Sequence, residues 1–375
     1  MEGENTLRIL FGPQHDGLHV NPAQSGAYEW WYFDAISDDG RFVLVAIYFL
    51  GSPMTPYYKA VVDGKSPDPR DWCGVFLSLH EKTSNGYRER AYAYNLYRSG
   101  DFSADIPQVH VGNSYLASDG EGVFWKWHLN AREQCLWRGD VRLDATFTAT
   151  GPPLDLPQMG DTNDAAHSWV CVAPVCRADV RVRLSNGKEV SFSGHGYHDH
   201  NFGQLPWSDV NIWYWGRGRI LEADNGERYP VYYRVDTPDG KNNAVVTIFD
   251  EHGKLVSLSS GDAQDKGLGQ FTWRNAYGLS GNSYISLGEQ TSSMSLYYLA
   301  SALCYPNTPD MLLGPILVNG SFYIRLFQYM SMQKWREQVK NFVGEDWGIG
   351  EVFRPARLCG PIASRAMWTR IRRRS

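Results

Sequence analysis

The chain of 375 residues lacks an excess of either charge, because 36 Lys and Arg nearly balance 41 Asp and Glu and leave a formal net charge of -5. Nucleic-acid binding requires a clustered basic face. We therefore expect no nucleic-acid partner. The length favours two domains of medium size.

Long apolar runs are also absent, since none reaches the roughly 18 residues that span a bilayer. Residues 1–5 have neither the basic start nor the apolar core of a signal peptide. These absences predict a cytoplasmic location. The tail 359–375 ends in the basic stretch Arg365–Ser375, for which weak peripheral contact with an anionic membrane is the alternative to a solvated tail.

Several catalytic and cofactor motifs are missing. None of the six cysteines forms a CxxC pair, so neither a zinc ribbon nor a dense disulfide framework is indicated, although a bridge between Cys171 and Cys176 stays open. No Gly-x-Ser-x-Gly elbow is present, and Gly216-Arg217-Gly218 is too short to hold a phosphate. We expect no serine or cysteine nucleophile and no nucleotide cofactor.

Turn signals are plentiful and favour an all-β fold. Runs such as 42–49, 179–184, 230–235 and 244–249 are β-branched or aromatic. Between such runs lie turns of the type Asp38-Asp39-Gly40 and Ser185-Asn186-Gly187. Antiparallel sheets that curl into barrels or sandwiches fit this rhythm best, with a domain junction near 185–190. Residues 295–345 break the rhythm and are interpreted as a partly helical insertion or lid.

Aromatic residues are abundant, with 14 Trp, 22 Tyr and 16 Phe. They suit the walls of a site for an apolar ligand, but they also suit the half-buried surface of any β-rich protein. Both interpretations stay open.

The densest polar cluster is Gly194–Gly203, which holds three histidines, a carboxylate, a phenol and an amide. On an extended strand, His198 and His200 point to one face, and Tyr197, Asp199 and Asn201 to the other. One face could line a cavity. The alternative is a polar strand end whose histidines bond to the backbone.

A second cluster, Tyr28–Asp34, places Glu29 on one face with Trp31 and Phe33. A carboxylate between indoles is desolvated, and desolvation raises the pKa of a carboxyl group. Glu29 is therefore a candidate proton donor. The alternative is a structural strand in which Glu29 pairs with an arginine.

A metal site at His198 and His200 lacks a nearby third ligand, because the following positions offer Gln204 and then Asp209. We therefore expect no metal. What remains is acid–base chemistry on an apolar molecule: protonation of an alkene gives a carbocation, which aromatic faces such as those of Trp207, Trp213, Tyr214 and Trp215 stabilise.

Three segments resemble the carotenoid 1,2-hydratase (hydroxyneurosporene synthase) family. They are Glu29–Asp34, Gly196–Gly203, and Gly348–Glu351 with Phe353–Pro355. This family lies within the AttH-like lipocalin-like superfamily, which also includes kievitone hydratase-like proteins and fungal Diels-Alderases. Phe202 stands where the central motif commonly has Trp.

The resemblance implies two tandem lipocalin-like antiparallel β-barrel domains, at 1–188 and 189–358, the second with the insertion at 295–345, followed by the tail. It implies catalysis without metal or cofactor, by protonation of a terminal isoprene double bond and capture of water. It also implies a catalytic His200 with Asp199 beside it, and a downstream Tyr and Asp for which Tyr233 and Asp236 are the nearest candidates.

Three functions therefore compete: a hydratase or cyclase acting by Brønsted acid catalysis on an isoprenoid or polyene, a pericyclase that folds a polyene, and a non-catalytic carrier of a lipophilic ligand. We predict the catalytic residues Asp199, His200, His198, Tyr197 and Glu29. The predicted substrate-binding residues are Trp30, Trp31, Tyr32, Phe202, Trp207, Trp213, Trp215, Tyr233 and Asp236.

Overall fold

The computed structural model describes residues 7–83, 86–105, 107–119, 124–135, 139–160, 167–222, 226–261, 263–264, 273–274, 280–281, 286–287, 347–353 and 372–374. The insertion predicted at 295–345 lies outside them. Strands dominate, and the described part of the chain contains one α-helix, α1 (Pro56–Val62). In that part, no helix combines the length and apolar character that crossing a membrane requires.

The chain divides into two compact units. The first comprises Met1–Ser208, His252–Lys254 and Arg370–Ser375, and the second comprises Asp209–Glu251 and Leu255–Thr369.

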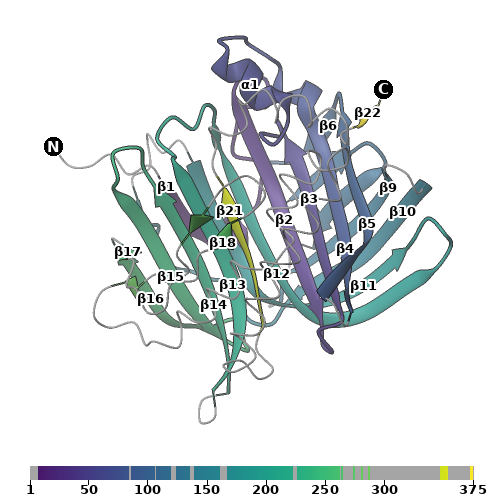
Figure 1. Ribbon diagram of the computed structural model, residues 1–375, viewed down its shortest axis with the longest axis vertical. Helices are drawn as coiled ribbons and strands as arrows, with labels where there is room; N and C mark the ends of the chain where they lie inside the picture. Colours follow the sequence, from purple (N-terminus) through teal and green to yellow (C-terminus); the bar gives the residue numbers. More distant parts are fainter. Residues whose placement is uncertain are drawn as a thin grey trace. The chain divides into compact units, whose positions relative to one another are not determined.

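The first unit is built on one 13-stranded sheet (Figure 1). In pairing order its strands are β22 (Arg372–Arg374), β5 (Gly86–Tyr97), β4 (Cys73–Thr83), β3 (Phe42–Leu50), β2 (Ala27–Ser37), β12 (Glu189–Gln204), β11 (His167–Arg183), β10 (Gly139–Ala149), β9 (Lys126–Cys135), β8 (Ser114–Ser118), β7 (Gln108–Val111) and β6 (Gly100–Phe102), with β1 (Leu7–Phe11) also paired to β11. Pairing is antiparallel except where β1 meets β11 and β22 meets β5. Two 3-10 helices, η1 (Pro13–His15) and η2 (Pro69–Trp72), lie in its connections.

This sheet curls around a continuous apolar core. Alternate residues of each strand enter that core, as Trp31 and Phe33 of β2 and Ala46 of β3 do. Strands far apart in pairing order meet across it: Tyr97 of β5 donates a hydrogen bond to Glu133 of β9 at 2.9 Å. The sheet is therefore nearly closed, and the prediction of an all-β, lipocalin-like fold is confirmed.

The second unit contains a five-stranded antiparallel sheet. Its strands, in pairing order, are β16 (Leu255–Gly261), β15 (Asn242–Asp250), β14 (Gly226–Asp236), β13 (Ile212–Glu222) and β21 (Trp347–Phe353). Short pairs are formed by β17 (Ala263–Gln264) with β20 (Ser286–Leu287) and by β18 (Trp273–Arg274) with β19 (Ser280–Gly281). Gly348–Glu351, part of the third segment that carries the resemblance, lies in β21, which pairs with β13.

The predicted turns fall between paired strands. Asp38-Asp39-Gly40 joins β2 to β3, and Ser185-Asn186-Gly187 joins β11 to β12. Gly40 and Gly187 have φ of 64° and 79°, a conformation that favours glycine and explains why both turns could be located from the sequence.

The division into units differs from the junction that the sequence indicated. A boundary between residues 188 and 189 would fall in the β11–β12 hairpin, whereas the compact units divide after Ser208. β12 lies in the first unit because it pairs with β11 on one side and β2 on the other. The basic tail is described only at Arg372–Arg374, which forms β22 rather than an unpaired segment.

Candidate functional site

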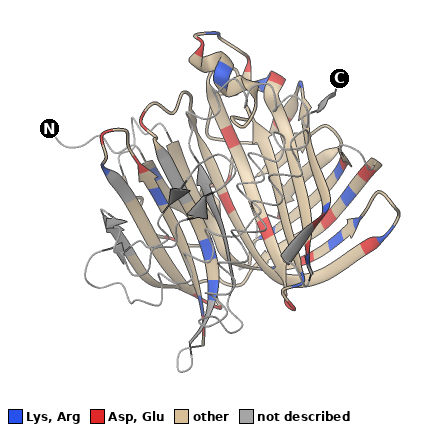
Figure 2. Cartoon of the chain, in the orientation of Figure 1, with Lys and Arg blue, Asp and Glu red and all other residues tan. Residues whose placement is uncertain are grey.

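The two polar clusters found in the sequence lie on adjacent strands. β2 and β12 pair antiparallel, with Trp31 opposite His200 and Tyr32 opposite Asp199. Figure 2 shows acidic positions within β2, a strand whose eleven residues are all buried. Charged groups at such positions require partners.

We call the side of these strands that faces the core the inner face, and the opposite side the outer face. Trp31, Phe33 and Phe202 belong to the core and mark the inner face. By strand alternation His198 and His200 share it, while Asp199 lies on the outer face. Asp199 and His200 therefore project from opposite faces of β12.

Asp16, which follows η1, organises the inner face. Its Oδ2 lies 2.9 Å from Nε2 of His198 and accepts a hydrogen bond of 2.8 Å from Nε1 of Trp127. Its Oδ1 lies 3.3 Å from Nδ1 of His200. Its main-chain carbonyl accepts a hydrogen bond from Nε1 of Trp31 at 2.9 Å. Asp16 carried no motif in the sequence, and only the tertiary contacts reveal it.

Glu29 is bound on the other side of His200. Its Oε1 lies 2.6 Å from Nε2 of His200 and accepts a hydrogen bond of 2.9 Å from the main-chain N–H of His19. Its Oε2 accepts one of 3.1 Å from the N–H of Val20. The partner of Glu29 is thus a histidine and a turn of main chain, not the arginine considered from the sequence.

The inner-face charges stabilise one another. Burial lowers the pKa of His200, but the negative charges of Glu29 and Asp16 outweigh it and raise that pKa to about 9. Burial raises the pKa of Asp16, yet His198 and His200 bring it down to about 2. Likewise the charge of His200 outweighs burial and lowers the pKa of Glu29. Burial alone would raise the pKa of Glu29, as the sequence suggested, but the His200 cation against it reverses the direction.

The pKa of Asp199 is shifted in the opposite direction to those of Asp16 and Glu29. On the outer face its Oδ2 accepts hydrogen bonds from Nε1 of Trp169 at 3.0 Å and from the Tyr197 hydroxyl at 2.9 Å, and its Oδ1 accepts one from Asn201 at 2.9 Å. Burial, reinforced by the charge of Asp34, nevertheless raises the pKa of Asp199 to about 7. This carboxyl group can hold a proton near neutral pH.

His167 extends this outer-face network. Its Nδ1 lies 2.6 Å from the Tyr28 hydroxyl, and its ring is hydrogen-bonded to the Asn201 side chain. Burial lowers the pKa of His167 to about 3, so the ring is neutral. A neutral imidazole accepts at one nitrogen and donates at the other, and it can therefore join Tyr28 to Asn201 and fix the amide that binds Asp199. No local pattern marks His167 in the sequence.

Aromatic rings cover the outer face near Asp199. Tyr28 stacks with Trp30 at 5.4 Å between ring centroids and meets Trp207 edge-on at 5.1 Å. Tyr32 meets Tyr197 edge-on at 6.2 Å. Three of the predicted substrate-binding residues, Trp30, Tyr32 and Trp207, are thus gathered on the face that carries Asp199.

Two further predicted aromatic residues lie on the inner face instead. Trp31 is 4.6 Å from the His200 ring, and Phe202 stacks on His19 at 4.0 Å. Both pack against the ion pairs.

The remaining predicted residues belong to the second unit. Trp215 and Tyr233 are buried and lie opposite each other on β13 and β14, and Asp236 pairs with Arg234. The side chain of Trp213 lies outside the described residues.

A metal ion was not expected because a third ligand was lacking. The fold supplies one: ligand atoms of His19, Glu29 and His200 lie within 4.8 Å of one another. Metal binding requires a deprotonated imidazole, whereas the two carboxylates keep the pKa of His200 high. In this structure Nε2 of His200 lies 2.6 Å from Oε1 of Glu29. In the described chain, Cys73, Cys135, Cys171 and Cys176 are buried free thiols, so Cys171 and Cys176 do not bridge.

The model of the family "Carotenoid hydratase CrtC" matches residues 46–283 of this chain. The chain belongs to the carotenoid hydratase CrtC family. The match includes β12, hence Asp199 and His200, but begins after Asp16 and Glu29.

Individual relatives carry several functional names. The acyclic carotenoid 1,2-hydratase of Thiocapsa roseopersicina is 29% identical over 65% of this chain and 55% of its own length. The hydroxyneurosporene dehydrogenase of Chlorobaculum tepidum is 25% identical over 91% and 85%. The quinolone epoxide rearrangement protein asqO of Emericella nidulans is 26% identical over 60% and 57%. The alignment thus spans about half the length of the Thiocapsa hydratase.

One solved structure, of an AttH candidate from Nitrosomonas europaea, aligns with 74% of this chain and 81% of its own, at 14% identity and a TM-score of 0.49.

Proposed function

We propose that this protein is an enzyme of the hydratase type that protonates a carbon–carbon double bond of an apolar isoprenoid or polyene, with Asp199 as proton donor. Membership of the carotenoid hydratase CrtC family supports the reaction class. The observation that carries the residue assignment is the Asp199 carboxyl group, which is buried beside aromatic rings and has a pKa raised to about 7.

The neighbouring acidic groups suit this role less well. A general acid works best when its pKa lies near the operating pH. The pKa values of Asp16 and Glu29 are lowered, so both are ionised at neutral pH. His200 binds its proton more tightly, with a pKa near 9. Asp199 alone of these four has a pKa near neutrality.

The proposed reaction balances without an electron donor or an organic cofactor. The π electrons of the alkene take the proton of Asp199, which forms a C–H bond and leaves a carbocation at the more substituted carbon. Trp30 and Tyr32 offer ring faces that stabilise a cation. Water then forms the C–O bond, and its surplus proton returns to the Asp199 carboxylate.

Isotope labelling tests the hydration. The purified chain is incubated with an acyclic carotenoid in oxygen-18 water, and the extracted product is analysed by mass spectrometry. We expect one heavy oxygen per product, and Asp199→Asn should lower turnover roughly 100-fold or more. The matched control is Asp144→Asn, at an exposed position of β10, which should leave turnover unchanged. An Asp199→Asn variant that retains most of its turnover would sink the assignment.

His200 supplies a second test, because the resemblance implies that it is catalytic while its side chain lies on the inner face. If His200 only holds the fold, His200→Gln should lower stability and spare the turnover of the remaining folded protein. Loss of turnover in fully folded protein would move the proposed site to the inner face.

A rearrangement or cyclisation is the second candidate function. It is favoured by the relatives named quinolone epoxide rearrangement proteins, of which penF from Penicillium thymicola is 37% identical over 75 residues. The same carboxyl group could protonate an epoxide oxygen and open the ring. Such a product has the mass of its substrate and no heavy oxygen. If the protein is a pericyclase, Asp199→Asn should retain most of the turnover. If it is a carrier, the ligand should be recovered unchanged.

Peripheral membrane contact through the basic tail also remains a proposal. Co-sedimentation of the full chain with anionic vesicles, but not with zwitterionic ones, would support it, and equal sedimentation with both would contradict it.

A further inference from the structure

Five titratable side chains of the inner face form a chain in which imidazole and carboxylate groups alternate. Nδ1 of His19 lies 3.3 Å from Oε1 of Glu29, and the same oxygen lies 2.6 Å from Nε2 of His200. Nδ1 of His200 lies 3.3 Å from Oδ1 of Asp16, and Oδ2 of Asp16 lies 2.9 Å from Nε2 of His198. The proposed reaction uses none of these groups. Each contact places a nitrogen that can carry a proton beside a carboxylate oxygen that can accept it.

His19 connects this chain to solvent. Its side chain is 24% exposed, whereas the side chains of the other four members are 0% exposed. A buried ionisable group exchanges its proton with water either through a chain of such contacts or through local opening of the fold. His19 is therefore the member of the chain at which a proton can enter while the fold stays closed.

The two groups nearest to solvent are fixed in place. The Glu29 carboxylate accepts hydrogen bonds from the main-chain N–H of His19 at 2.9 Å and from that of Val20 at 3.1 Å. The His19 ring stacks on Phe202, with 4.0 Å between ring centroids, and meets the His200 ring edge-on at 5.4 Å. Proton transfer needs a heavy-atom separation of about 2.6–3.2 Å and good alignment. The His19 contact, and the ring nitrogens of His200, which lack aligned hydrogen bonds, reach this geometry by small ring motions.

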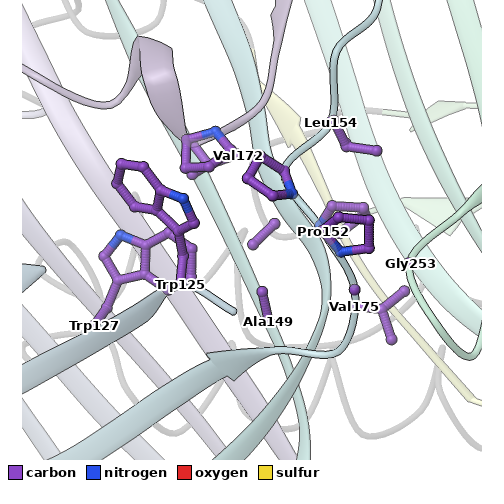
Figure 3. A pocket seen from close by; sticks show the side chains of 13 residues that line it. Trp125, Trp127, Ala149, Pro152, Leu154, Val172, Val175 and Gly253 are labelled. Carbon is purple, nitrogen blue, oxygen red and sulfur yellow. The ribbon is translucent and has the colours of Figure 1, made fainter. Parts of the chain in front are cut away.

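The far end of the chain is closed. Nδ1 of His198 lies 2.9 Å from the main-chain carbonyl of Tyr32, which can accept a hydrogen bond but takes up no proton. Trp127 covers the other side of this histidine, because its ring meets His198 edge-on at 5.0 Å. Figure 3 shows Trp127 lining a recess together with Trp125 and Val172, and none of the side chains that line this recess is titratable. The recess thus supplies no acid–base group that would give protons a second entry.

Two further charged or titratable groups, Arg8 and His15, lie near the entry. Burial lowers the pKa of His15, and the positive charges of His19 and Arg8 lower it further. His15 is therefore close enough to His19 for their charges to interact. It provides a neighbouring imidazole with which the role of His19 can be compared.

We propose that His19, Glu29 and His200 form a proton relay between solvent and the buried inner face. In the inward direction, water protonates the His19 ring, Nδ1–H gives its proton to Oε1 of Glu29, and Oε1 passes it to Nε2 of a neutral His200. His19 and Glu29 return to their starting states, so the net change is one proton moved from water to His200. The outward direction reverses each step. The relay depends on neither Asp199 nor the proposed hydration, and it would serve any reaction step that takes a proton from His200.

Proton exchange with water measures the relay in the full chain without any substrate. In protein that carries nitrogen-15-labelled histidine, NMR saturation transfer from water to the ring N–H of His200 gives its exchange rate. His19→Phe keeps a ring against Phe202 but removes both nitrogens, and it should slow this exchange by roughly tenfold or more. His15→Phe makes the same change at the neighbouring imidazole and should leave the rate unchanged. Exchange of the main-chain N–H groups of β12 shows whether local opening is the same in all three proteins.

Each result decides for or against the relay. Slower exchange in His19→Phe alone, with unchanged main-chain exchange in β12, would support it. A His200 ring proton that exchanges no faster than the main chain of β12 in the unmodified protein would overturn it, because local opening would then explain the exchange. Equal rates in folded His19→Phe and in the unmodified chain would also overturn it, as would equal slowing by the two variants. Since no substrate is present, none of these results depends on whether Asp199 catalyses hydration.

Discussion

Asp199 and His200 are neighbours in the chain, yet the carboxyl group of Asp199 bonds to Trp169 on the outer face while the imidazole of His200 lies 2.6 Å from Glu29 on the inner face. One strand thus separates a group whose proton can leave near neutral pH from a cation fixed between carboxylates. Because their surroundings differ, the two side chains should make the stability of the protein depend on pH in different ranges.

The stability of the protein should fall as pH rises from about 4 to 7 because of Asp199. In this window the unfolded chain has lost the proton of Asp199 while the folded chain keeps it, since burial raises the pKa from 3.8 to about 7. The resulting loss of unfolding free energy over this pH range amounts to about 4 kcal/mol at most. Urea unfolding from pH 4 to 8 measures it, and Asp199→Asn should remove this component. A variant with the same pH slope as the unmodified protein would contradict the raised pKa.

His200 should act in a higher window. Its pKa is raised from 6.5 to about 9. The contribution of His200 to the free energy of unfolding is therefore complete below pH 6.5 and is lost as pH rises through 9. His200→Gln removes the cation that lies against Glu29 and should lower the free energy of unfolding by about 3–5 kcal/mol at pH 7. The double variant with Glu29→Gln should recover part of that loss. Strictly additive losses would show that the two side chains are not coupled.

Asn201 should tune Asp199. Its amide donates a hydrogen bond to Oδ1, which favours the ionised carboxylate. Asn201→Leu keeps the approximate size but removes the donor, so the pKa of Asp199 should rise further. Infrared spectroscopy of the carboxyl band in a pH titration reads this directly, and Asn130→Leu, on β9, serves as the matched change elsewhere. A carboxyl titration unmoved by Asn201→Leu would rule out this control of Asp199.

Trp127 should contribute to stability through its N–H as well as its ring. Trp127→Phe removes the hydrogen bond to Asp16 within a buried cluster and should cost about 1–3 kcal/mol of unfolding free energy. Trp125→Phe removes the same group from the neighbouring indole, which lies 6.2 Å away between ring centroids. Denaturant unfolding midpoints of the two variants measure the difference. Equal losses of unfolding free energy would mean that the hydrogen bond to Asp16 adds nothing beyond packing.

The sequence by itself determined the local geometry. Alternation along β12 separated His198 and His200 from Asp199, and alternation along β2 placed Glu29 with Trp31 and Phe33, because strand side chains have a period of two. Glycine turns such as Ser185-Asn186-Gly187 located the hairpins, since their positive φ favours glycine. The motif around Asp199 and His200 indicated the family that the match over residues 46–283 shows.

Only the tertiary structure decided which groups surround these residues. Asp16 reaches His198 across 182 positions of sequence. His167, from β11, contacts Tyr28, and Trp127, from β9, contacts Asp16. The sign of the Glu29 pKa shift depended on the cation that folding brings against it, which no local pattern contains. Likewise β12 lies in the first unit because of its pairing with β2, a long-range contact that turn signals leave undetermined. Burial and charge act through space, and the fold decides which residues meet there.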